Sequence, residues 1–375
     1  YRTVHSYIAL INELLNLRTG HIFNFYNKQS HGGLKETFEK NKDIKVVHGN
    51  VFDFFPAILG KTFLKVYLWI LGACPWLYEM MYKWGNRGGG SLWMREFING
   101  ALAYLGSGFI KKVNPDVVIA THATPAGIMS IYKRRKQSSL YLCGVVTDYT
   151  VHTWWICDGV DTYFIADELL REKFPSAFET QAFGIPIREG FQNLDKASCR
   201  ESFGWKKEDK VCLLMGGGDG LLPMEEIISS LIKDKPSNLQ IVALTVKNKS
   251  LYKNLLAKFG DSVEVYSFTD KVPELFCGAD MIVSKAGGLS SAEILASNLE
   301  YIIYKPLPGQ EENNAKFLQA NCGATIATNI KEVNSKIKEL CGISASQTEK
   351  NKQFFGKPKA SESICNYILC RLQKI

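Results

Sequence analysis

Two glycines followed by hydroxyl residues stand at 285–293, where the sequence reads KAGGLSSAE. The run just before them, 281–285, is apolar enough for a buried strand, so these residues are expected to open a helix. The start of a helix carries partial positive charge and unpaired backbone amides, which suit a diphosphate. Glu293 is then placed to accept hydrogen bonds from ribose hydroxyls, although a capping box with Ser290 as the cap explains the same pattern. The candidate binding residues are Gly287, Gly288, Leu289, Ser290, Ser291 and Glu293.

A second glycine-rich loop, Met-Gly-Gly-Gly-Asp-Gly at 215–220, also follows an apolar run. Glycines let a backbone come close to a ligand, and free amides hold phosphate oxygens, but a tight strand–helix turn needs the same residues. Leu221 takes the last glycine position of the GxGxxG pattern, and no Lys-Ser/Thr of a P-loop is present. The loop therefore favours neither a dehydrogenase nor an NTPase, and its ligand-binding candidates are Gly216, Gly217 and Gly218.

A third candidate is the polar loop–helix junction at 306–315. Gln310, Glu311 and Asn314 have side chains of the kind that read sugar hydroxyls. A solvated helix start is the alternative explanation.

The elements that carry these loops alternate regularly from Asp209 onward. The expected strands are 211–215, 239–246, 263–268, 281–285, 301–304 and 324–327, with amphipathic helices such as 224–232 and 251–259 between them. This alternation predicts a mostly parallel sheet with helices on both faces, which binds ligands at the carboxyl ends of its strands. The first half is less regular, with strands expected at 117–121, 140–147 and 162–166.

The length of 375 residues favours two domains, with a boundary near 188–194. We predict domains at 1–190 and 191–355 and a final helix within 356–375. The net charge of +8 favours anionic partners, but no nucleic-acid-binding motif accompanies it, so a nucleic-acid partner is not expected. Ten cysteines without CxxC spacing and the lack of a signal peptide suggest a reducing cytoplasm. The longest apolar stretch, 66–77, contains Pro75 and is too short to span a bilayer.

Taken together, the three loops resemble the donor half of GT-B glycosyltransferases of the monogalactosyldiacylglycerol synthase and processive diacylglycerol glucosyltransferase family, and more remotely the lipid II GlcNAc transferase. The similar segments are YKPLPGQE at 304–311, GIPIR at 184–188, and VTDY at 146–149 with His152 and Trp155 behind it. The resemblance implies an α/β fold of two Rossmann-like domains facing each other across a cleft, with the last helix crossing back to the first domain.

The resemblance also implies an inverting transfer of glucose or galactose from a UDP-sugar to the hydroxyl of diacylglycerol. The family's base lies in a GxGHxxxA loop after the first strand, and 1–9 stands in that place, with His5 and Ala9 matching. No strand precedes His5, so the chain either begins part-way through the domain or has a diverged loop. Asp148 is the second catalytic candidate, with a strand-end helix cap as the alternative, and Phe268 corresponds to the nucleotide-base contact. No DxD motif follows a strand, so neither a metal nor a cofactor is expected.

On the acceptor side, tryptophans lie among apolar and basic residues between 54 and 105, a composition that suits a membrane interface as well as a domain core. The acceptor and membrane candidates are Trp69, Trp76, Trp93, His152 and Trp155. We expect a peripheral protein on the cytoplasmic face of the cell membrane that binds anionic lipid. Two alternatives remain: a catalytically impaired UDP-sugar-binding homologue, and a transferase acting on another lipid such as a polyprenyl diphosphate intermediate.

Overall fold

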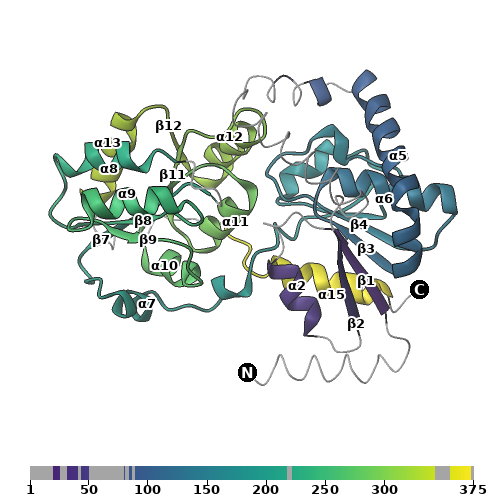
Figure 1. Cartoon of the computed structure of the whole chain (residues 1–375), viewed down its shortest axis with the longest axis horizontal. Coiled ribbons are helices and arrows are strands. Elements are labelled where there is room, and N and C mark those ends of the chain that lie inside the picture. The colour runs from purple at the N-terminus through teal and green to yellow at the C-terminus, as the bar shows by residue number, and fades with distance from the viewer. Residues whose placement is uncertain are drawn as a thin grey trace. The chain divides into compact units, whose positions relative to one another are not determined.

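The computed structural model describes residues 20–25, 32–40, 44–49, 80, 84–86, 89–217, 222–342 and 355–372. The chain divides into two compact units. The first unit comprises Tyr1–Glu189 together with Lys359–Ile375, and the second comprises Gly190–Pro358 (Figure 1).

The first unit contains a six-stranded parallel sheet. Its strands are β1 (Gly20–Phe25), β2 (Ile44–Gly49), β3 (Val117–Ala120), β4 (Tyr141–Val145), β5 (Thr162–Phe164) and β6 (Glu179–Gln181). They are ordered β2-β1-β3-β4-β5-β6. β2 therefore lies on one side of β1, and β3 to β6 follow in sequence order on the other side of β1. The order therefore reverses between β1 and β3, and open parallel sheets bind ligands at the carboxyl ends of the strands beside such a point.

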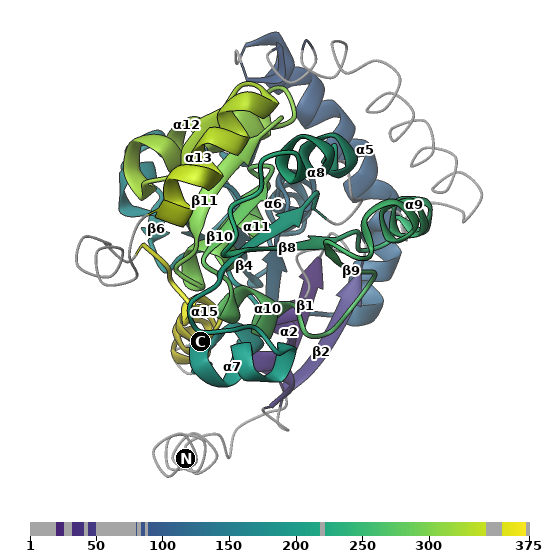
Figure 2. The same ribbon diagram turned by 90° about the vertical axis from the view of Figure 1, so that its left-hand side faces the viewer.

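Helices α2 and α15 pack together on this sheet and lie side by side in Figures 1 and 2. The main helices of the unit are α2 (Gly32–Glu39), α5 (Gly90–Val113), α6 (Ala123–Lys136) and α15 (Ala360–Leu372). Leu34 and Phe38 from α2 share a buried apolar cluster with Ile364 and Ile368 from α15 and with residues of β3 and β4. The last helix of the chain thus belongs to the core of the first unit.

Helix α5 is unusual because it buries small residues and exposes large ones. The face toward α6 includes Ser91, Asn99, Gly100, Ala103 and Gly106. The other side carries the exposed side chains of Trp93, Phe97, Ile98, Tyr104 and Leu105. Trp93 is 71% exposed and Tyr104 78% exposed, whereas aromatic rings usually supply a large share of the buried apolar area of a domain. Yet no helix in the described part of the chain is long and apolar enough to cross a bilayer.

The second unit contains another six-stranded parallel sheet, ordered β12-β11-β10-β7-β8-β9. Its strands are β7 (Lys210–Met215), β8 (Leu239–Leu244), β9 (Glu264–Tyr266), β10 (Met281–Ser284), β11 (Glu300–Tyr304) and β12 (Thr325–Ala327). The helices are α7 (Lys196–Phe203), α8 (Met224–Ile232), α9 (Lys249–Phe259), α10 (Val272–Gly278), α11 (Gly288–Ala296), α12 (Gln310–Cys322) and α13 (Ile330–Gly342). Apolar residues of α8, α9 and α13 form a buried cluster with the sheet. The order reverses between β7 and β10.

The predicted α/β fold of two domains with parallel sheets is confirmed. All six strands expected after Asp209 are present within one to two residues at each end. In the first unit the sequence analysis found β3, β4 and β5 but missed β1, β2 and β6.

Candidate functional site

The candidate donor site lies in the second unit, where the strand order reverses. Gly216 and Gly217 follow β7, and 285–288 follows β10, its neighbour in the sheet. The hydroxyl of Ser284 donates to the carbonyl oxygen of Met215 at 2.8 Å, which ties the two strand ends together. Gly217 has a φ of +71°, a conformation that favours glycine. The first two glycine-rich motifs of the sequence therefore meet at one edge of one sheet; Gly218 lies outside the described residues.

Helix α11 begins at this edge with Gly287 as its N-cap and without a side-chain cap. The amide of Ser291 makes the first bond of the helix, to the carbonyl oxygen of Gly287 at 2.8 Å. The amides of 288–290 therefore precede the helical ladder, and these residues are half-buried. This geometry corrects the capping-box alternative: Ser290 lies inside the first turn and is not the cap, and Glu293 lies in the second turn.

Two of the predicted donor residues, Ser291 and Asn314, make hydrogen bonds that hold the loop after β10. Tyr301 donates its hydroxyl proton to the carbonyl oxygen of Lys285 at 2.6 Å, so Ser291 is the donor in its 3.0 Å contact with the Tyr301 oxygen. Burial, opposed by the Ser291 hydrogen bond, raises the pKa of Tyr301, which keeps that proton in place. The fully buried Asn314 amide donates to the carbonyl oxygen of Ala286 at 3.1 Å. Asn314 thus holds the backbone of the loop after β10 directly, and Ser291 holds it through Tyr301.

Glu311 shapes the loop from the other side. One of its carboxylate oxygens accepts the backbone N–H of Leu307 at 2.7 Å, and the other lies 3.6 Å from the ammonium nitrogen of Lys285. Glu312 accepts the N–H of Gly309, the N-cap of α12, at 3.2 Å. Lys285 is 7% exposed, and a charge that is taken out of water needs a partner. The sequence analysis gave Lys285 no role, although a lysine at the end of an apolar strand is a usable signal.

Two further predicted residues are placed without a ligand to test them. Gln310 opens α12 beside this loop, and Phe268 follows β9 with 67% of its surface exposed. Val246 follows β8 with a φ of +51°. A β-branched residue rarely adopts this conformation, so the Val246 backbone is strained.

The candidate acceptor side lies in the first unit, at the carboxyl ends of β1, β3 and β4. Thr121 and His122 follow β3, and Thr147 and Asp148 follow β4. The His122 Nδ1 caps α6 by accepting the N–H of Thr124 at 3.2 Å. The His152 Nδ1 accepts the N–H of Trp154 at 3.2 Å and caps the 3-10 helix η2 (Thr153–Trp155). His152, not Asp148, is the cap there, so the helix-cap interpretation of Asp148 is wrong.

Two of the acceptor and membrane predictions can be compared with the structure. Trp155 is only 4% exposed, and its carbonyl oxygen accepts the Tyr163 hydroxyl at 2.5 Å. The Trp155 ring is therefore packed inside the first unit and not on its surface. Trp93 is exposed on α5. Trp69 and Trp76 lie outside the described residues.

A strand that was not expected from the sequence bears on the candidate base. This strand, β1, pairs with both β2 and β3 and is the first strand among the described residues of this sheet. His5 lies outside the described residues and precedes β1 in the chain, so it does not stand in the loop that follows β1. In the sequence, residues 26–31 stand between β1 and α2, and His31 directly precedes Gly32, the first residue of α2. His31 itself lies outside the described residues. An apolar run followed by His-Gly-Gly was the signal the sequence analysis missed.

The start of α2 is held in place by the rest of the unit. A Cβ atom on Gly33 would lie 1.9 Å from the carbonyl oxygen of Ile187, so only glycine fits there. The Ser361 hydroxyl donates to the same oxygen at 2.8 Å. The GIPIR segment and α15 thus fix the first turn of α2 against the sheet.

The chain has two α/β units, each built on a parallel sheet, and its C-terminal helix belongs to the first unit. This combination defines a GT-B glycosyltransferase fold. Acinetobacter baumannii MurG shares it with a TM-score of 0.59 at 14% identity, over 95% of this chain and all of that one. The UDP co-structure of Staphylococcus aureus MnaA aligns with a TM-score of 0.58 at 15% identity, over 95% of this chain and 96% of that one.

Family models assign each unit separately. Residues 27–187 match the model of monogalactosyldiacylglycerol (MGDG) synthase, and residues 211–364 match the glycosyltransferase family 28 C-terminal domain. The processive diacylglycerol β-glucosyltransferase of Bacillus subtilis is 30% identical over 242 residues. That alignment covers 62% of this chain and 62% of the relative, so the match spans less than two thirds of the curated protein. The first unit therefore resembles MGDG synthase, and the second resembles the C-terminal domain of glycosyltransferase family 28.

Proposed function

We propose that this protein is an inverting glycosyltransferase that moves glucose or galactose from a UDP-sugar to the hydroxyl of diacylglycerol. The observation that carries the proposal is the donor edge of the second unit, where the start of α11 and the loop after β7 meet between β10 and β7. The name of the Bacillus relative supports the lipid acceptor, and the UDP in the MnaA structure supports the nucleotide.

The donor half of the reaction uses the second unit. The amides of 288–290 receive the diphosphate, and Glu293 accepts hydrogen bonds from the ribose hydroxyls. The buried Lys285 ammonium adds positive charge close to the same loop. As the bond between the anomeric carbon and the diphosphate oxygen breaks, the electron pair leaves with UDP. Preorganised amides stabilise that growing charge.

The acceptor half uses the first unit. We assign the base to His31, because it directly precedes α2 in the chain and follows β1, the strand that borders β3 where the strand order reverses. The acceptor oxygen attacks the anomeric carbon from the face opposite UDP while its proton passes to the imidazole. Asp148, after β4, is the candidate to orient the base or the acceptor. This assignment removes the reason for proposing an impaired homologue, which was the poor match around His5.

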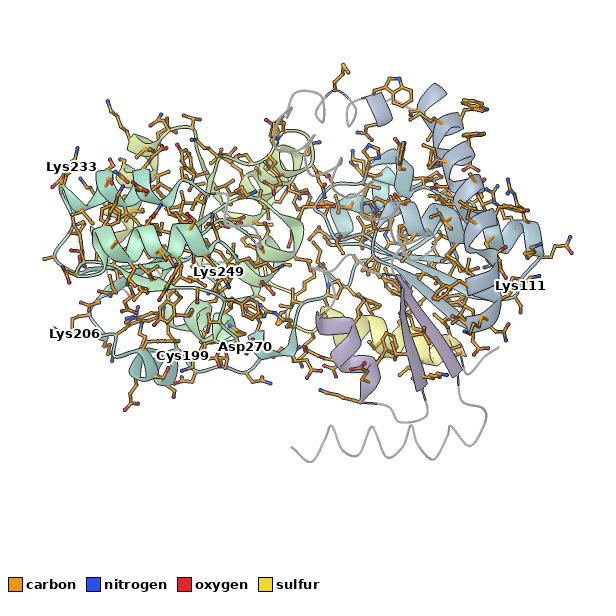
Figure 3. The ribbon with its side chains drawn as sticks, in the orientation of Figure 1. Lys111, Cys199, Lys206, Lys233, Lys249 and Asp270 are labelled. Carbon is orange, nitrogen blue, oxygen red and sulfur yellow. The ribbon has the colours of Figure 1, made fainter. Side chains whose placement is uncertain are left out.

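The lipid acceptor requires a membrane surface, and α5 is the element suited to reach it. Trp93, Phe97, Tyr104 and Lys111 are spaced by four and seven residues and share the exposed face of the helix. Lys111, labelled in Figure 3, and Lys112 end the helix with positive charge. Aromatic rings with adjacent lysines suit the interface of an anionic bilayer. We therefore propose peripheral binding to the cytoplasmic face of the cell membrane through α5.

The test is transfer from radiolabelled UDP-glucose or UDP-galactose to diacylglycerol in vesicles of phosphatidylcholine and phosphatidylglycerol. The parent protein is expected to form a glycolipid with one of the two donors. His31→Ala should lower kcat by about 10²–10⁴-fold, the usual contribution of a general base, while UDP binding stays unchanged. His5→Ala is the matched control and should retain activity. Loss of activity in the His5 variant but not the His31 variant would overturn the assignment, and no product with either donor would overturn the proposed reaction.

A further inference from the structure

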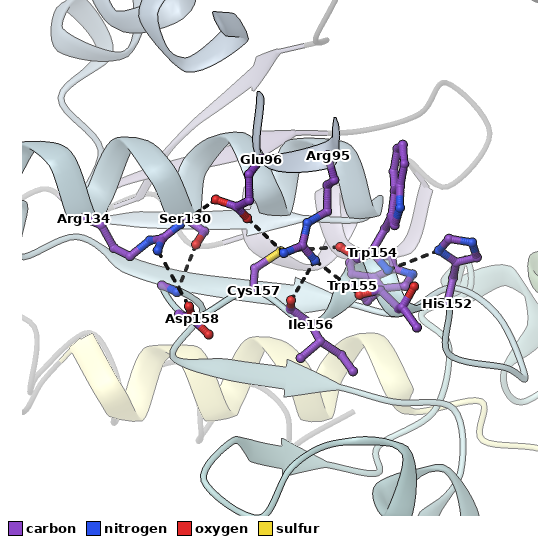
Figure 4. Close-up of polar contacts among 12 residues, drawn as sticks. Arg95, Glu96, Ser130, Arg134, His152, Trp154, Trp155, Ile156, Cys157 and Asp158 are labelled. Atoms are coloured by element: carbon purple, nitrogen blue, oxygen red, sulfur yellow. Dashed lines mark hydrogen bonds and ion pairs between the residues drawn. The ribbon is translucent and has the colours of Figure 1, made fainter. Parts of the chain in front are cut away.

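Arg95 joins the exposed helix α5 to the segment that follows β4. It lies on the opposite face of α5 from Trp93 and is 8% exposed. Its Nη1 donates to the carbonyl oxygens of Ile156 at 2.9 Å and Thr153 at 3.3 Å, and its Nη2 pairs with Glu96 at 2.9 Å (Figure 4). One planar guanidinium therefore donates hydrogen bonds to two backbone carbonyls of 152–157, a geometry that lysine cannot reproduce.

The residues just before α5 contact the same segment. The Asn86 side chain accepts the N–H of Thr153 at 3.0 Å, and the carbonyl oxygen of Gly85 accepts its hydroxyl at 3.0 Å. That Gly85 oxygen also accepts the hydroxyl of Ser91, in the first turn of α5, at 2.9 Å. His152 packs so closely that a Cβ on Gly85 would lie 3.3 Å from its Cε1. The start of α5 and segment 152–157 are thus bound as one piece.

The contact leaves some polar groups unpaired. Among the described residues, the buried Nε of Arg95 and Nε1 of Trp154 have no hydrogen-bond partner. Buried donors without acceptors are costly, so an arrangement that pairs them is more stable.

We propose that Arg95 is a positioning residue that couples bilayer docking of α5 to the order of segment 152–157, beside Asp148 on the acceptor side. The inference rests on the membrane binding proposed above. The bilayer fixes the orientation of α5 through its aromatic face. The two hydrogen bonds from Arg95, on the opposite face, then restrict the motion of the backbone of segment 152–157. Because the bonds go to backbone atoms, they hold the chain itself and therefore the ring of His152 at its start.

Hydrogen exchange of the full chain, with and without vesicles of phosphatidylcholine and phosphatidylglycerol, tests the coupling without requiring activity. In the parent, vesicles should slow the amides of Trp154–Cys157 by about tenfold, a typical size for coupling between sites. Arg95→Met should sediment with vesicles as the parent does, because the exposed face is intact, but its segment should gain no protection. Glu96→Gln is the matched control: it removes the neighbouring charge, keeps both carbonyl bonds and should retain the protection.

The outcomes separate the two proposals. A parent that does not bind vesicles refutes membrane docking and this inference with it. A parent that binds vesicles without protecting 154–157 refutes this inference alone, as does an Arg95→Met variant that is protected like the parent. If circular dichroism shows that Arg95→Met does not fold, Arg95→Lys decides, since its single ammonium reaches one carbonyl at a time and should give intermediate protection. Full protection in the lysine variant would overturn the role assigned to the guanidinium.

Discussion

Replacing Gly33 with alanine tests whether the first turn of α2 is fixed as the structure indicates. The added Cβ would lie 1.9 Å from the Ile187 carbonyl oxygen and 2.3 Å from the Ser361 Oγ. A carbon and an oxygen normally approach to about 3.3 Å, so the backbones must separate by roughly 1.4 Å. The Ser361 side chain can rotate away, but it then loses its hydrogen bond to Ile187. The Ile187 obstacle is backbone and cannot rotate.

The expected cost follows from these contacts. Overpacking of this kind costs about 1–3 kcal/mol, and the lost Ser361 hydrogen bond adds about 1 kcal/mol. Alanine recovers up to about 1 kcal/mol through its higher helix propensity, and less than that in a first turn. The first unit should therefore lose about 2 kcal/mol of stability against unfolding.

Gly108→Ala is the matched control, because Gly108 lies within α5, is exposed and has nothing within 4 Å of an added Cβ. That variant should gain roughly 0.5–1 kcal/mol from propensity alone. The assay is hydrogen exchange of the β3 amides, Val117–Ala120, which reports unfolding of the first unit specifically. A Gly33 variant as stable as the parent would refute the close approach of α2 to Ile187, and with it the fixed start of α2 beside the proposed base.

Three other substitutions test the second unit and the last helix. Val246→Asn should stabilise the second unit by about 1 kcal/mol in urea unfolding, because asparagine tolerates a positive φ, whereas Val246→Ile should give no gain. Glu293→Ala should weaken UDP binding by about 1–3 kcal/mol in calorimetry. The control Glu300→Ala, at the amino end of β11, should bind UDP as the parent does. Unchanged UDP affinity in the Glu293 variant would rule out the ribose contact. Burial disfavours the Glu179 carboxylate, but hydrogen bonds from Tyr367 and Arg371 and the arginine charge outweigh this and lower its pKa. The stability that this carboxylate contributes is therefore present above the ordinary glutamate pKa and is lost as pH falls toward the lowered pKa. Glu179→Gln should flatten that part of the curve of unfolding free energy against pH. A curve identical to the parent's would contradict the assignment.

The second unit could be predicted from sequence because each of its strands is a short apolar run that ends in glycine or polar residues. β7 and β10, for example, are buried along nearly their whole length, and their loops carry the binding motifs directly. β1, β2 and β6 gave no such signal. β1 reads GHIFNF and β2 reads IKVVHG, with polar residues interrupting the apolar ones, and β6 is a three-residue edge strand. Because β1 was missed, the candidate base was sought at 1–9, ahead of this strand, and not in the residues that follow it.

Some contacts could not be predicted because they join residues far apart in the sequence. Nothing near Asn314 or Ser291 in the chain indicates that their side chains bind the 285–286 backbone and Tyr301, so both were assigned to the ligand. The same limit applies to α5. Its apolar content suggested a membrane contact, but only the packing of its small residues on α6 shows which face is left for a bilayer. The aromatic composition suggested the membrane hypothesis, and the burial of Ser91, Gly100 and Ala103 shows that Trp93 lies on the outward face of α5.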